Sequence, residues 1–592
     1  MVEPRFRWAL PTPVDVSPAV HAAGLELGLG RHALGLLALR GVADPDALGA
    51  FFAPAADGLH DPRLLPDAER FLDRIGRARA GGERVLVFGD FDADGLTGLT
   101  VLTRALRRTG IEAIPYVPHR VDEGHGLSQG GIQAAVDAGA TLIVTVDCGS
   151  TSVAEVDAAA ARGIEVIVSD HHRVPEEAPR AVAIVNPHRP DATYPDRRLT
   201  GAGLAFKLAA LLLDRPGGHD DLAELAALAA VGTVADVAPV LGENRSIARL
   251  GLEAIRAGRS AGIAALLRRA GTEPASVDLE TIGFVIAPRL NAASRVGEAA
   301  DAAALLLTDD PAEADRLADL LEAANLERRD LTRTAVAEAR ATIPEGHAEP
   351  ATVIRGDWPV GIVGLVAARL AEEHGRAAVV GSNLGSIVRA SCRSDGRLDL
   401  AATLRACDDL LLRYGGHRGA AGFEIAADRW DAFRDRFLAL AAEAVPADPR
   451  VSLSLDLVVD AEAVDYALLR DLARLAPFGP GHPDPLLAIT GLTATRVRPA
   501  TGGHTQFTLR RRLDVLDGIA FGRADLADTV QAGSQIDIVA RLSSRRFGGF
   551  ESLQLDIRDA AGVGHIAGLT AEQAARPLVA VGPGPGAVVA AR

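Results

Sequence analysis

The stretch VLVFGDFDADGLTG (residues 85–98) decides the fold of this chain. Its first four residues are apolar and predict a short buried strand, and three acids, Asp90, Asp92 and Asp94, follow directly. Similar apolar runs recur, and Ala-rich amphipathic segments separate them; the runs are TLIVTV (141–146), EVIVS (165–169) and AVAIV (181–185), and the segments are 98–109, 129–138 and 152–162. Continuous apolar strands that alternate with helices predict an α/β fold with a doubly wound parallel sheet, covered on both faces.

Acids and histidines follow two further strands of this predicted sheet. Asp147 comes directly after TLIVTV, and Asp170, His171 and His172 come directly after EVIVS. A further acid, Asp236, lies in AVGTVADVAPV. Because open parallel sheets bind ligands at the carboxyl ends of their strands, we expect these side chains to meet at one edge. For any single Asp, a turn or helix cap is an equally good explanation, but it is a poor one for the whole set.

So many ionisable groups in one crevice predict a metal centre. The carboxylates would repel one another at neutral pH unless cations neutralised them. Carboxylate and imidazole ligands suit manganese or magnesium better than structural zinc. The number of ligands predicts two divalent cations roughly 3.5–4 Å apart, as in many enzymes that cleave phosphodiesters.

Composition places the chain among ordinary globular proteins. Its 592 residues predict about three to five domains. The three cysteines, Cys148, Cys392 and Cys407, form no CxxC pair, so we expect neither a disulfide framework nor a zinc site, and we expect a reducing cytoplasm. Apolar runs stay well below the roughly 18 residues of a membrane helix, so no membrane association is expected. The net charge of −16 does not exclude a nucleic-acid ligand, because binding depends on a local basic surface.

The four acidic motifs resemble those of the DHH phosphoesterase superfamily; they are GDFDADG (89–95), VDCG (146–149), SDHH (169–172) and GTVADVAPV (232–240). Each motif is weak alone, but their order and spacing together are specific. The resemblance implies that Asp147 bridges the cations, that His172 orients substrate or ligands, and that the metal ligands are Asp90, Asp92, Asp94, Asp147, His171 and Asp236. Asp170 would hydrogen-bond an imidazole.

Four further segments resemble RecJ-type exonucleases; they are HRVDEGHGLS (119–128), GAGLAFKL (201–208), LGENRSIARLGL (241–252) and APRLNAASRVG (287–297). The resemblance implies that Asn291 and Arg295 lie near the scissile phosphate. Ser294 stands where the family commonly has glycine, so the local turn is expected to differ.

A second pattern of alternating strands and helices covers roughly residues 350–442. Three of its segments resemble the DHHA1 domain; they are DWPVGIVGLVAARL (357–370), ASCRSDGRLDL (390–400) and YGGHRGAAGF (414–423). The resemblance implies that the backbone at Gly415 and Gly416 approaches phosphates, and that His417 reaches the scissile or an adjacent phosphate. It further implies that Ser391 and Arg393 bind a terminal 5′-phosphate, with Arg120 and Arg295 on the other side of a cleft between the DHH and DHHA1 domains. A supporting or capping histidine is the alternative for His417, and a surface salt bridge is the alternative for each arginine.

Residues 451–560 alternate with period two, which predicts a small β-barrel, and they resemble the RecJ OB-fold. Phe507, Phe547 and Phe550 are candidates for stacking on bases, although Phe507 suits the barrel core equally well. The expected organisation is an N-terminal extension (1–55), a DHH domain (56–298), connecting helices (299–345), a DHHA1 domain (346–445), an OB-fold (446–562) and a flexible tail (563–592). Residues 299–342 are Ala/Leu-rich and charged, and they predict a long helix that joins the DHH and DHHA1 domains.

The resemblance implies a single-stranded-DNA-specific 5′-to-3′ exonuclease that releases 5′-mononucleotides by two-metal hydrolysis in recombination and repair. It implies single-strand-binding protein and a RecQ-like helicase as partners. One alternative is a phosphodiesterase of short oligonucleotides or cyclic dinucleotides, although those enzymes usually end after DHHA1. The other is a non-catalytic scaffold of the Cdc45 kind, which the complete set of acids and histidines argues against.

Overall fold

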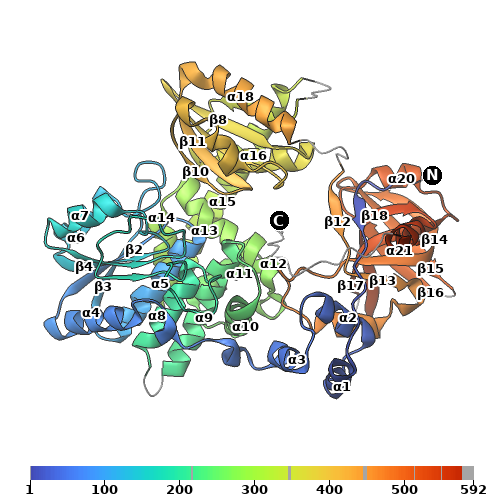
Figure 1. Ribbon diagram of the computed structural model, residues 1–592, viewed down its shortest axis with the longest axis horizontal. Helices are drawn as coiled ribbons and strands as arrows, with labels where there is room; N and C mark the ends of the chain where they lie inside the picture. Colours follow the sequence, from blue (N-terminus) through green and yellow to red (C-terminus); the bar gives the residue numbers. More distant parts are fainter. Residues whose placement is uncertain are drawn as a thin grey trace. The chain divides into compact units, whose positions relative to one another are not determined.

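The computed structural model describes residues 2–214, 218–344, 349–444, 450–512, 514–547 and 550–575. Contacts divide the chain into two units, which Figure 1 shows as ribbons. Among the described residues, the larger unit comprises 54–444 with 479–481, and the smaller comprises 2–53 and 450–478 with 482–575. None of the helices in the described part of the chain is long and apolar enough to span a bilayer.

The larger unit contains two sheets, and the first is the parallel five-stranded sheet that the sequence predicts. Its order is β3-β2-β4-β5-β6, with β2 (Arg84–Gly89), β3 (Glu112–Tyr116), β4 (Ala140–Val146), β5 (Glu165–Ser169) and β6 (Ala183–Val185). The chain passes from β2 outward to β3 and then returns to the other side of β2 for β4. The strand order therefore reverses between β2 and β4, which is where doubly wound sheets bind their ligands.

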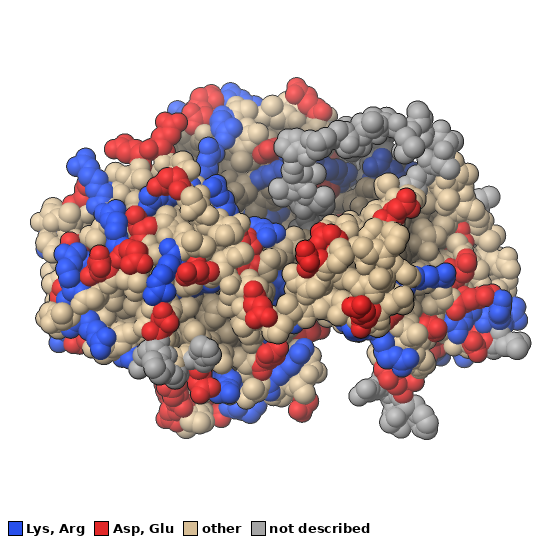
Figure 2. All heavy atoms as spheres, turned by 60° about the horizontal axis from the view of Figure 1, so that its bottom comes forward, with Lys and Arg blue, Asp and Glu red and all other residues tan. Residues whose placement is uncertain are grey.

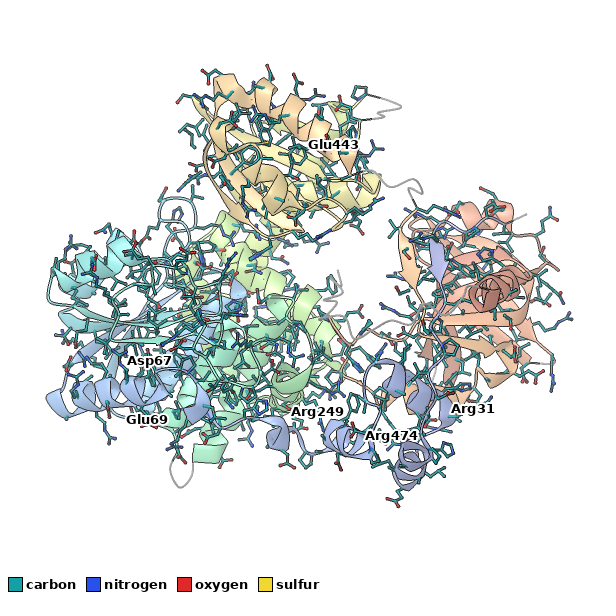
Figure 3. All side chains as sticks on the ribbon, in the orientation of Figure 1. Arg31, Asp67, Glu69, Arg249, Glu443 and Arg474 are labelled. Atoms are coloured by element: carbon teal, nitrogen blue, oxygen red, sulfur yellow. The ribbon has the colours of Figure 1, made fainter. Side chains whose placement is uncertain are left out.

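Helices surround this sheet: α4 (Ala68–Gly81), α5 (Ala93–Arg108), α6 (Gln129–Asp137), α7 (Val153–Ala160), α8 (Gly201–Leu212), α9 (Gly218–Ala235), α10 (Gly242–Arg256) and α11 (Ala261–Arg269), with short 3₁₀ turns at Ala55–Gly58, Pro62–Leu64 and Pro274–Ser276. Asp67, labelled in Figure 3, precedes α4 and accepts hydrogen bonds from the backbone of Ile184 (2.9 Å) and from Arg189 (2.7 Å). It thereby ties the start of α4 to the edge strand β6.

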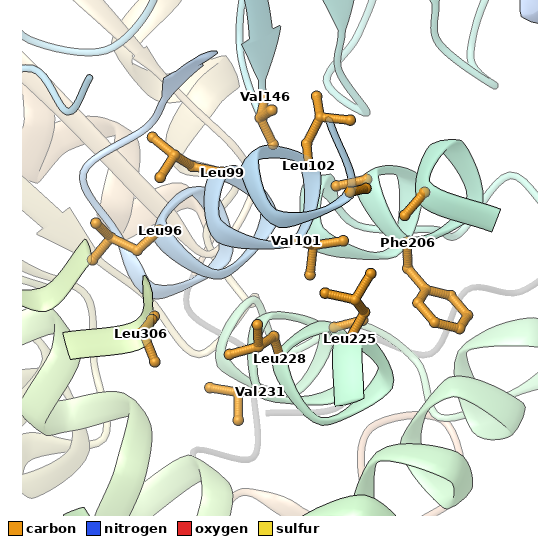
Figure 4. Close-up of a cluster of buried hydrophobic side chains, with 14 of the residues drawn as sticks. Leu96, Leu99, Val101, Leu102, Val146, Phe206, Leu225, Leu228, Val231 and Leu306 are labelled. Carbon is orange, nitrogen blue, oxygen red and sulfur yellow. The ribbon is translucent and has the colours of Figure 1, made fainter. Parts of the chain in front are cut away.

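Helix α5 is the buried centre of this domain. Every residue from Ala93 to Leu106 is buried, and Figure 4 shows Leu96, Leu99, Val101 and Leu102 among side chains of the neighbouring elements, which are Val146, Phe206, Leu225, Leu228, Val231 and Leu306. Burying one such side chain contributes about 1.5–3 kcal/mol. The packing therefore fixes the helix that carries Asp94.

A run of helices connects the parallel sheet to the second sheet: α12 (Leu279–Thr281), a π-helical turn η4 (Ile282–Ile286), α13 (Ala287–Val296), α14 (Ala299–Leu307) and α15 (Pro311–Ala341). The sequence indicates one long charged helix here, but the structure has two. Asp310 accepts a hydrogen bond from the backbone of Ala312 (3.0 Å), and Pro311 follows it. A cap followed by proline starts a new helix, because proline lacks the N–H that would continue the old one.

The second sheet is mixed, with order β10-β11-β9-β8-β7. Its strands are β7 (Thr352–Gly356), β8 (Ala378–Leu384), β9 (Ile387–Arg393), β10 (Leu411–Gly416) and β11 (Ala420–Ala426), and only β7 and β8 run parallel. Its helices are α16 (Val360–His374), α17 (Leu400–Arg405) and α18 (Trp430–Glu443), with 3₁₀ turns at Asp408–Leu410 and Ala427–Arg429. One apolar cluster joins the sheet to α17 and α18, and another joins it to α16 and α15.

The smaller unit contains the β-barrel that the sequence predicts. Strands β14 (Leu487–Ala500), β15 (His504–Arg511), β16 (Asp514–Ala520), β18 (Phe550–Gly562) and β17 (Gln535–Phe547) pair in that order, and β17 pairs with β14 to close the barrel. Around it lie β12 (Ser452–Ser454), β13 (Leu457–Asp460), a 3₁₀ turn (Ala461–Ala463), α19 (Tyr466–Ala473) and α20 (Asp525–Thr529). Phe507 is buried in the barrel core, whereas the side chains of Phe547 and Phe550 lie outside the described residues.

Residues 1–53 pack on this barrel. They form β1 (Arg7–Ala9), α1 (Pro18–Glu26), α2 (Arg31–Leu39) and α3 (Pro45–Phe52). Strand β1 pairs with β12, and Trp8 Nε1 donates to Asp559 Oδ2 (2.8 Å). Arg474, labelled in Figure 3, donates to the carbonyl oxygens of Leu27 (2.7 Å) and Gly28 (2.9 Å). The segment set apart as an extension is thus integrated into the barrel unit, through partners hundreds of residues away that no local pattern records.

The expected flexible tail begins as an ordered helix, α21 (His565–Ala575). Ile566 is buried, and its backbone N–H donates to Asp537 Oδ2 (2.9 Å). The Gly/Pro/Ala-rich composition that predicts a tail belongs to the residues from 576 onward, which lie outside the described residues. The prediction was therefore wrong for residues 565–575, because it extended that composition too far back.

Candidate metal centre

The segment from the end of β2 to the first turn of α5 presents three carboxylates at the switch point of the sheet. Asp90 directly follows β2 and is buried. Asp92 caps α5, because its Oδ1 accepts hydrogen bonds from the backbone of Asp94 (3.0 Å) and Gly95 (3.1 Å). Asp94 accepts hydrogen bonds from two backbone N–H groups at the start of α8, those of Gly201 (2.7 Å) and Ala202 (2.9 Å). Helix N-termini thus orient two of the three carboxylates.

Asp147 follows β4 in a strained conformation. Its φ of 64° lies in the left-handed region, which is uncommon for a residue other than glycine. Gly201 packs against it, and a Cβ on Gly201 would lie 2.4 Å from the Cβ of Asp147. Strain of this kind persists where the surroundings enforce it, commonly at functional sites.

The two histidines after β5 have different partners. His171 Nε2 lies 3.0 Å from Asp147 Oδ1 and 3.8 Å from Asp94 Oδ2. His172 Nδ1 lies 2.8 Å from Asp170 Oδ1, and the other oxygen of Asp170 accepts from the backbone of Ser150 (2.9 Å). Asp170 thus orients His172, as expected of an acid beside an imidazole.

All the predicted ligands come together. Among the described residues, these side chains form three overlapping groups, and within each group the ligand atoms lie within 4.8 Å of one another. The first group is Asp90, Asp92 and Asp147, the second is Asp94, His171 and Asp236, and the third is Asp147, His171 and His172. Asp236 joins the cluster from the end of α9.

The electrostatics of the cluster fit divalent cations. Burial, and then the charges of Asp94, Asp92 and Asp90, raise the pKa of Asp147 well above its usual value. Burial and neighbouring carboxylates also raise the pKa of Asp92 to about 6 and that of Asp236 to about 8. Two buried oxygens, Asp90 Oδ1 and Asp147 Oδ1, make no hydrogen bond within the described part of the chain. Buried polar atoms are normally satisfied, and a cation would satisfy these.

His125 also belongs to this cluster, and the sequence analysis missed it. Its Nδ1 lies 3.0 Å from Asp90 Oδ2, and its ring centre lies 5.0 Å from that of His172. Burial alone would lower the pKa of His125, but the hydrogen bond and charge of Asp90 raise it to about 9. The position of His125 in the chain indicates this placement. His125 follows β3, the strand next to β2, and side chains beyond the carboxyl ends of neighbouring parallel strands lie at the same edge of the sheet.

Three predicted phosphate-binding arginines lie near one another, since the charges of Arg120 and Arg393 act on Arg295. Arg120 stacks 4.2 Å above the ring of Phe91, and Arg295 donates to the carbonyl oxygen of Gly361 (2.8 Å). Arg393 donates to the carbonyl of Cys392 (2.8 Å). Within the described ranges, none of the three forms an ion pair. Burial, and then the charges of Arg120 and Arg393, lower the pKa of Arg295 to about 9. The cluster is therefore suited to an anion.

Two further predicted substrate residues lie beside these arginines. Asn291 Oδ1 accepts a hydrogen bond from the backbone of Ala93 (2.9 Å), so its amide oxygen holds the start of α5. Ser391 and Arg393 lie beside Gly364, where a Cβ would be 3.4 Å from the Ser391 hydroxyl and 3.1 Å from an Arg393 nitrogen. The glycine leaves both side chains room.

The turn between β10 and β11 carries the remaining predicted residues. Gly415, Gly416 and His417 are exposed, and the backbone of His417 donates to Ala420 (2.8 Å). Gly416 has a φ of 139°, and a Cβ there would lie 2.4 Å from the Cα of Ala421. Among the described residues, His417 makes no side-chain contact with the acids, and its role stays a prediction.

On the face that Figure 2 shows, basic and acidic side chains are intermixed. The net charge of −16 is therefore not gathered into one acidic patch on that face.

Comparisons with known proteins agree with this arrangement. Models of the DHH family N-terminal domain, the DHHA1 domain and the RecJ OB domain match residues 84–233, 349–443 and 455–559. The single-stranded-DNA-specific exonuclease RecJ of Bacillus subtilis is 32% identical over 572 residues, which are 95% of this chain and 71% of the relative. RecJ of Thermus thermophilus in complex with Mn²⁺ is 31% identical with a TM-score of 0.80, covering 94% of this chain and 80% of that one. The Mg²⁺ complex of the same protein is 30% identical, has a TM-score of 0.74 and covers 94% and 78%. The chain belongs to the RecJ family of single-stranded-DNA-specific exonucleases.

Proposed function

We propose that this chain is a divalent-metal-dependent exonuclease that is specific for single-stranded DNA and releases 5′-mononucleotides from the 5′ end. One observation carries the proposal: carboxylates and imidazoles cluster at one edge of the parallel sheet, and two buried carboxylate oxygens of this cluster make no hydrogen bond within the described residues. Three arginines of the same unit, Arg120, Arg295 and Arg393, form no ion pair among the described residues. The similarity to Mn²⁺- and Mg²⁺-bound RecJ over most of the chain supports it.

The cluster offers ligands for two cations, Mn²⁺ or Mg²⁺; they are Asp90, Asp92, Asp94, Asp147, His171 and Asp236. Asp147 and His171 each occur in two of the three ligand groups, and of the two only the carboxylate has two ligand oxygens, which supports the prediction that Asp147 would be shared by the two cations. When bound, the cations would generate a hydroxide nucleophile from water and neutralise charge on the leaving oxygen. The chain contributes orientation: hydrogen bonds from two helix N-termini hold Asp92 and Asp94 before any ion arrives.

His172 and the arginines would act on the substrate. Asp170 engages Nδ1 of His172, which leaves Nε2 for a phosphate oxygen. Arg295 would hold the scissile phosphate beside Asn291, while Arg393, Ser391 and Arg120 would hold a terminal 5′-phosphate. A guanidinium grips phosphate through two parallel hydrogen bonds, so these groups would fix the 5′ end. His417 and the backbone at Gly415 and Gly416 would contact an adjacent phosphate from the second sheet.

The barrel favours a long strand over a dinucleotide as substrate. The RecJ OB domain model matches residues 455–559, and such barrels bind single strands along a groove. The test compares long single-stranded DNA, duplex DNA and dinucleotides, with and without Mn²⁺. We expect Mn²⁺-dependent degradation of the single strand alone; hydrolysis of dinucleotides alone would show that the enzyme is an oligonucleotide phosphodiesterase.

The organisation into DHH (56–298), connecting (299–345), DHHA1 (346–445) and OB-fold (446–562) segments is part of this proposal. So is a cytoplasmic role in DNA recombination and repair beside single-strand-binding protein and a RecQ-like helicase. Three free, buried cysteines support a reducing compartment. Co-purification with single-strand-binding protein tests the partnership, and no enrichment over an unrelated nuclease would contradict it.

A further inference from the structure

The loop from β3 to α6 is fixed at several points. Glu123 accepts hydrogen bonds from the Tyr116 hydroxyl (2.9 Å) and from the backbone of His119 (2.7 Å). The backbone of Leu127 donates to the hydroxyl of Ser152 (3.2 Å), which precedes α7. The loop therefore has a defined conformation without any substrate.

Two glycines turn this loop so that His125 reaches the carboxylates. Gly124 and Gly126 have φ values of 76° and 97°, a region that side chains larger than hydrogen disfavour. His125 lies between them, and its Nδ1 lies 3.0 Å from Asp90 Oδ2. Because an ionised carboxylate only accepts hydrogen bonds, Nδ1 must be the donor.

The two oxygens of Asp90 consequently have different environments. Oδ2 is engaged by His125, whereas Oδ1 is buried and makes no hydrogen bond within the described residues. A carboxylate held through one oxygen keeps both lone pairs of the other oxygen free for a cation. Groups that orient metal ligands in this way typically contribute 10–100-fold to metal affinity.

We propose that His125 is a positioning residue of the metal centre, which holds Asp90 through Oδ2 and so presents Oδ1 to a divalent cation. The proposal rests on the proposed function for the presence of that cation. His125 itself does not coordinate the metal; it acts through Asp90.

The test measures Mn²⁺ affinity of the full chain by calorimetry, without DNA. His125→Ala should weaken Mn²⁺ binding about 10–100-fold. His125→Asn places an amide N–H near the position of Nδ1 and should restore most of the affinity. His125→Gln places its amide near Nε2 and should not. The matched control is His119→Ala in the same loop. Among the described residues the exposed His119 ring pairs with Asp122 (2.7 Å), so the Mn²⁺ affinity of this variant should be unchanged.

Wild-type affinity in His125→Ala would overturn the proposal, as would rescue by Gln and not by Asn. A spin-echo measurement of nitrogen couplings to bound Mn²⁺ separates positioning from ligation, since loss of a histidine coupling in His125→Ala would make His125 a ligand instead. Thermal unfolding of each variant shows whether the fold is intact. A wild-type chain that binds Mn²⁺ without degrading DNA would refute the exonuclease but leave this comparison valid. A wild-type chain that binds no Mn²⁺ would refute both.

Discussion

At the scale of single residues, the predicted metal centre depends on a glycine, Gly201, because a side chain at this position would collide with Asp147. Gly201 begins α8, donates its N–H to Asp94 and packs against Asp147. A methyl group there would lie 2.4 Å from the Cβ and 2.7 Å from the Cγ of Asp147, distances that require backbone movement. Gly201 thus contacts two predicted ligands on different elements, Asp94 and Asp147, and influences the distance between them.

Gly201→Ala should therefore lower the Mn²⁺-dependent rate on single-stranded DNA by about 100-fold, since a displacement of about 1 Å has that effect on positioned groups. The control is Gly203→Ala in the same helix, where the nearest atom to the new Cβ would be 3.4 Å away. It should retain nearly the wild-type rate. Initial rates on labelled single strands decide, and an unimpaired Gly201→Ala enzyme would contradict the geometry.

Ser294 supports Arg120 through its hydroxyl group. Its hydroxyl accepts a hydrogen bond from Arg120 Nε (3.3 Å) and donates to the carbonyl of Asn291 (3.2 Å). Removing the hydroxyl in Ser294→Ala should cost about 0.5–1.5 kcal/mol of substrate binding, roughly 2–12-fold in KM, with kcat unchanged. Steady-state kinetics on 5′-phosphorylated strands measure this. A change in kcat with constant KM would show that Arg120 acts in the reaction step instead.

The sequence predicts which side chains meet at the sheet edge only where they are adjacent to strand ends. Asp90, Asp147 and His171 meet because parallel strands bring their carboxyl ends to one edge. His125 and Ser294 escaped prediction because their partners, Asp90 and Arg120, depend on the path of a loop and on the placement of α13. The path of that loop and the placement of α13 depend on tertiary contacts, which no hydrophobic periodicity in the sequence predicts.

At the scale of elements, α5 links the hydrophobic core to the site. Leu102 is fully buried between α5 and its neighbours (Figure 4), and the same helix carries Asp94 and is capped by Asp92. Leu102→Ala should destabilise the fold by about 2–5 kcal/mol, through lost burial and the cavity left behind. Leu326→Ala on α15, half-exposed at 50%, is the control and should change stability by less than about 0.5 kcal/mol.

Chemical denaturation monitored by circular dichroism gives both values. Equal stability of Leu102→Ala and Leu326→Ala would show that the core around α5 is not close-packed. The sequence predicts β2, β4 and β5 to within one residue because their apolar runs are continuous. It misses the break between α14 and α15, since Asp310 and Pro311 interrupt the helix without interrupting its composition.

At the scale of the whole molecule, the first 53 residues complete the C-terminal unit. Asp559 is fully buried and accepts hydrogen bonds from Trp8 Nε1 (2.8 Å) and Arg523 (2.7 Å), as well as from the backbone of Arg5 and Phe6. Trp8→Phe keeps an aromatic ring but removes one donor to a buried carboxylate. It should cost about 1–3 kcal/mol.

Differential scanning calorimetry of the full chain would show this loss in the transition of the barrel unit. Arg31→Ala, at an exposed position of α2, should leave the transition in place. An unchanged profile for Trp8→Phe would mean that the N-terminal segment contributes little to the barrel. The sequence could not predict this association, because Trp8 and Asp559 are 551 positions apart.

The central claim is metal-dependent cleavage of single-stranded DNA from the 5′ end. It is tested most directly by digesting one single strand, labelled at either end, with Mn²⁺ and either the wild-type chain or Asp147→Ala. The wild-type chain should release the 5′ label at once as a mononucleotide and shorten the 3′-labelled strand progressively, and Asp147→Ala should do neither. Release of the 3′ label first, or undiminished digestion by Asp147→Ala, would contradict the account.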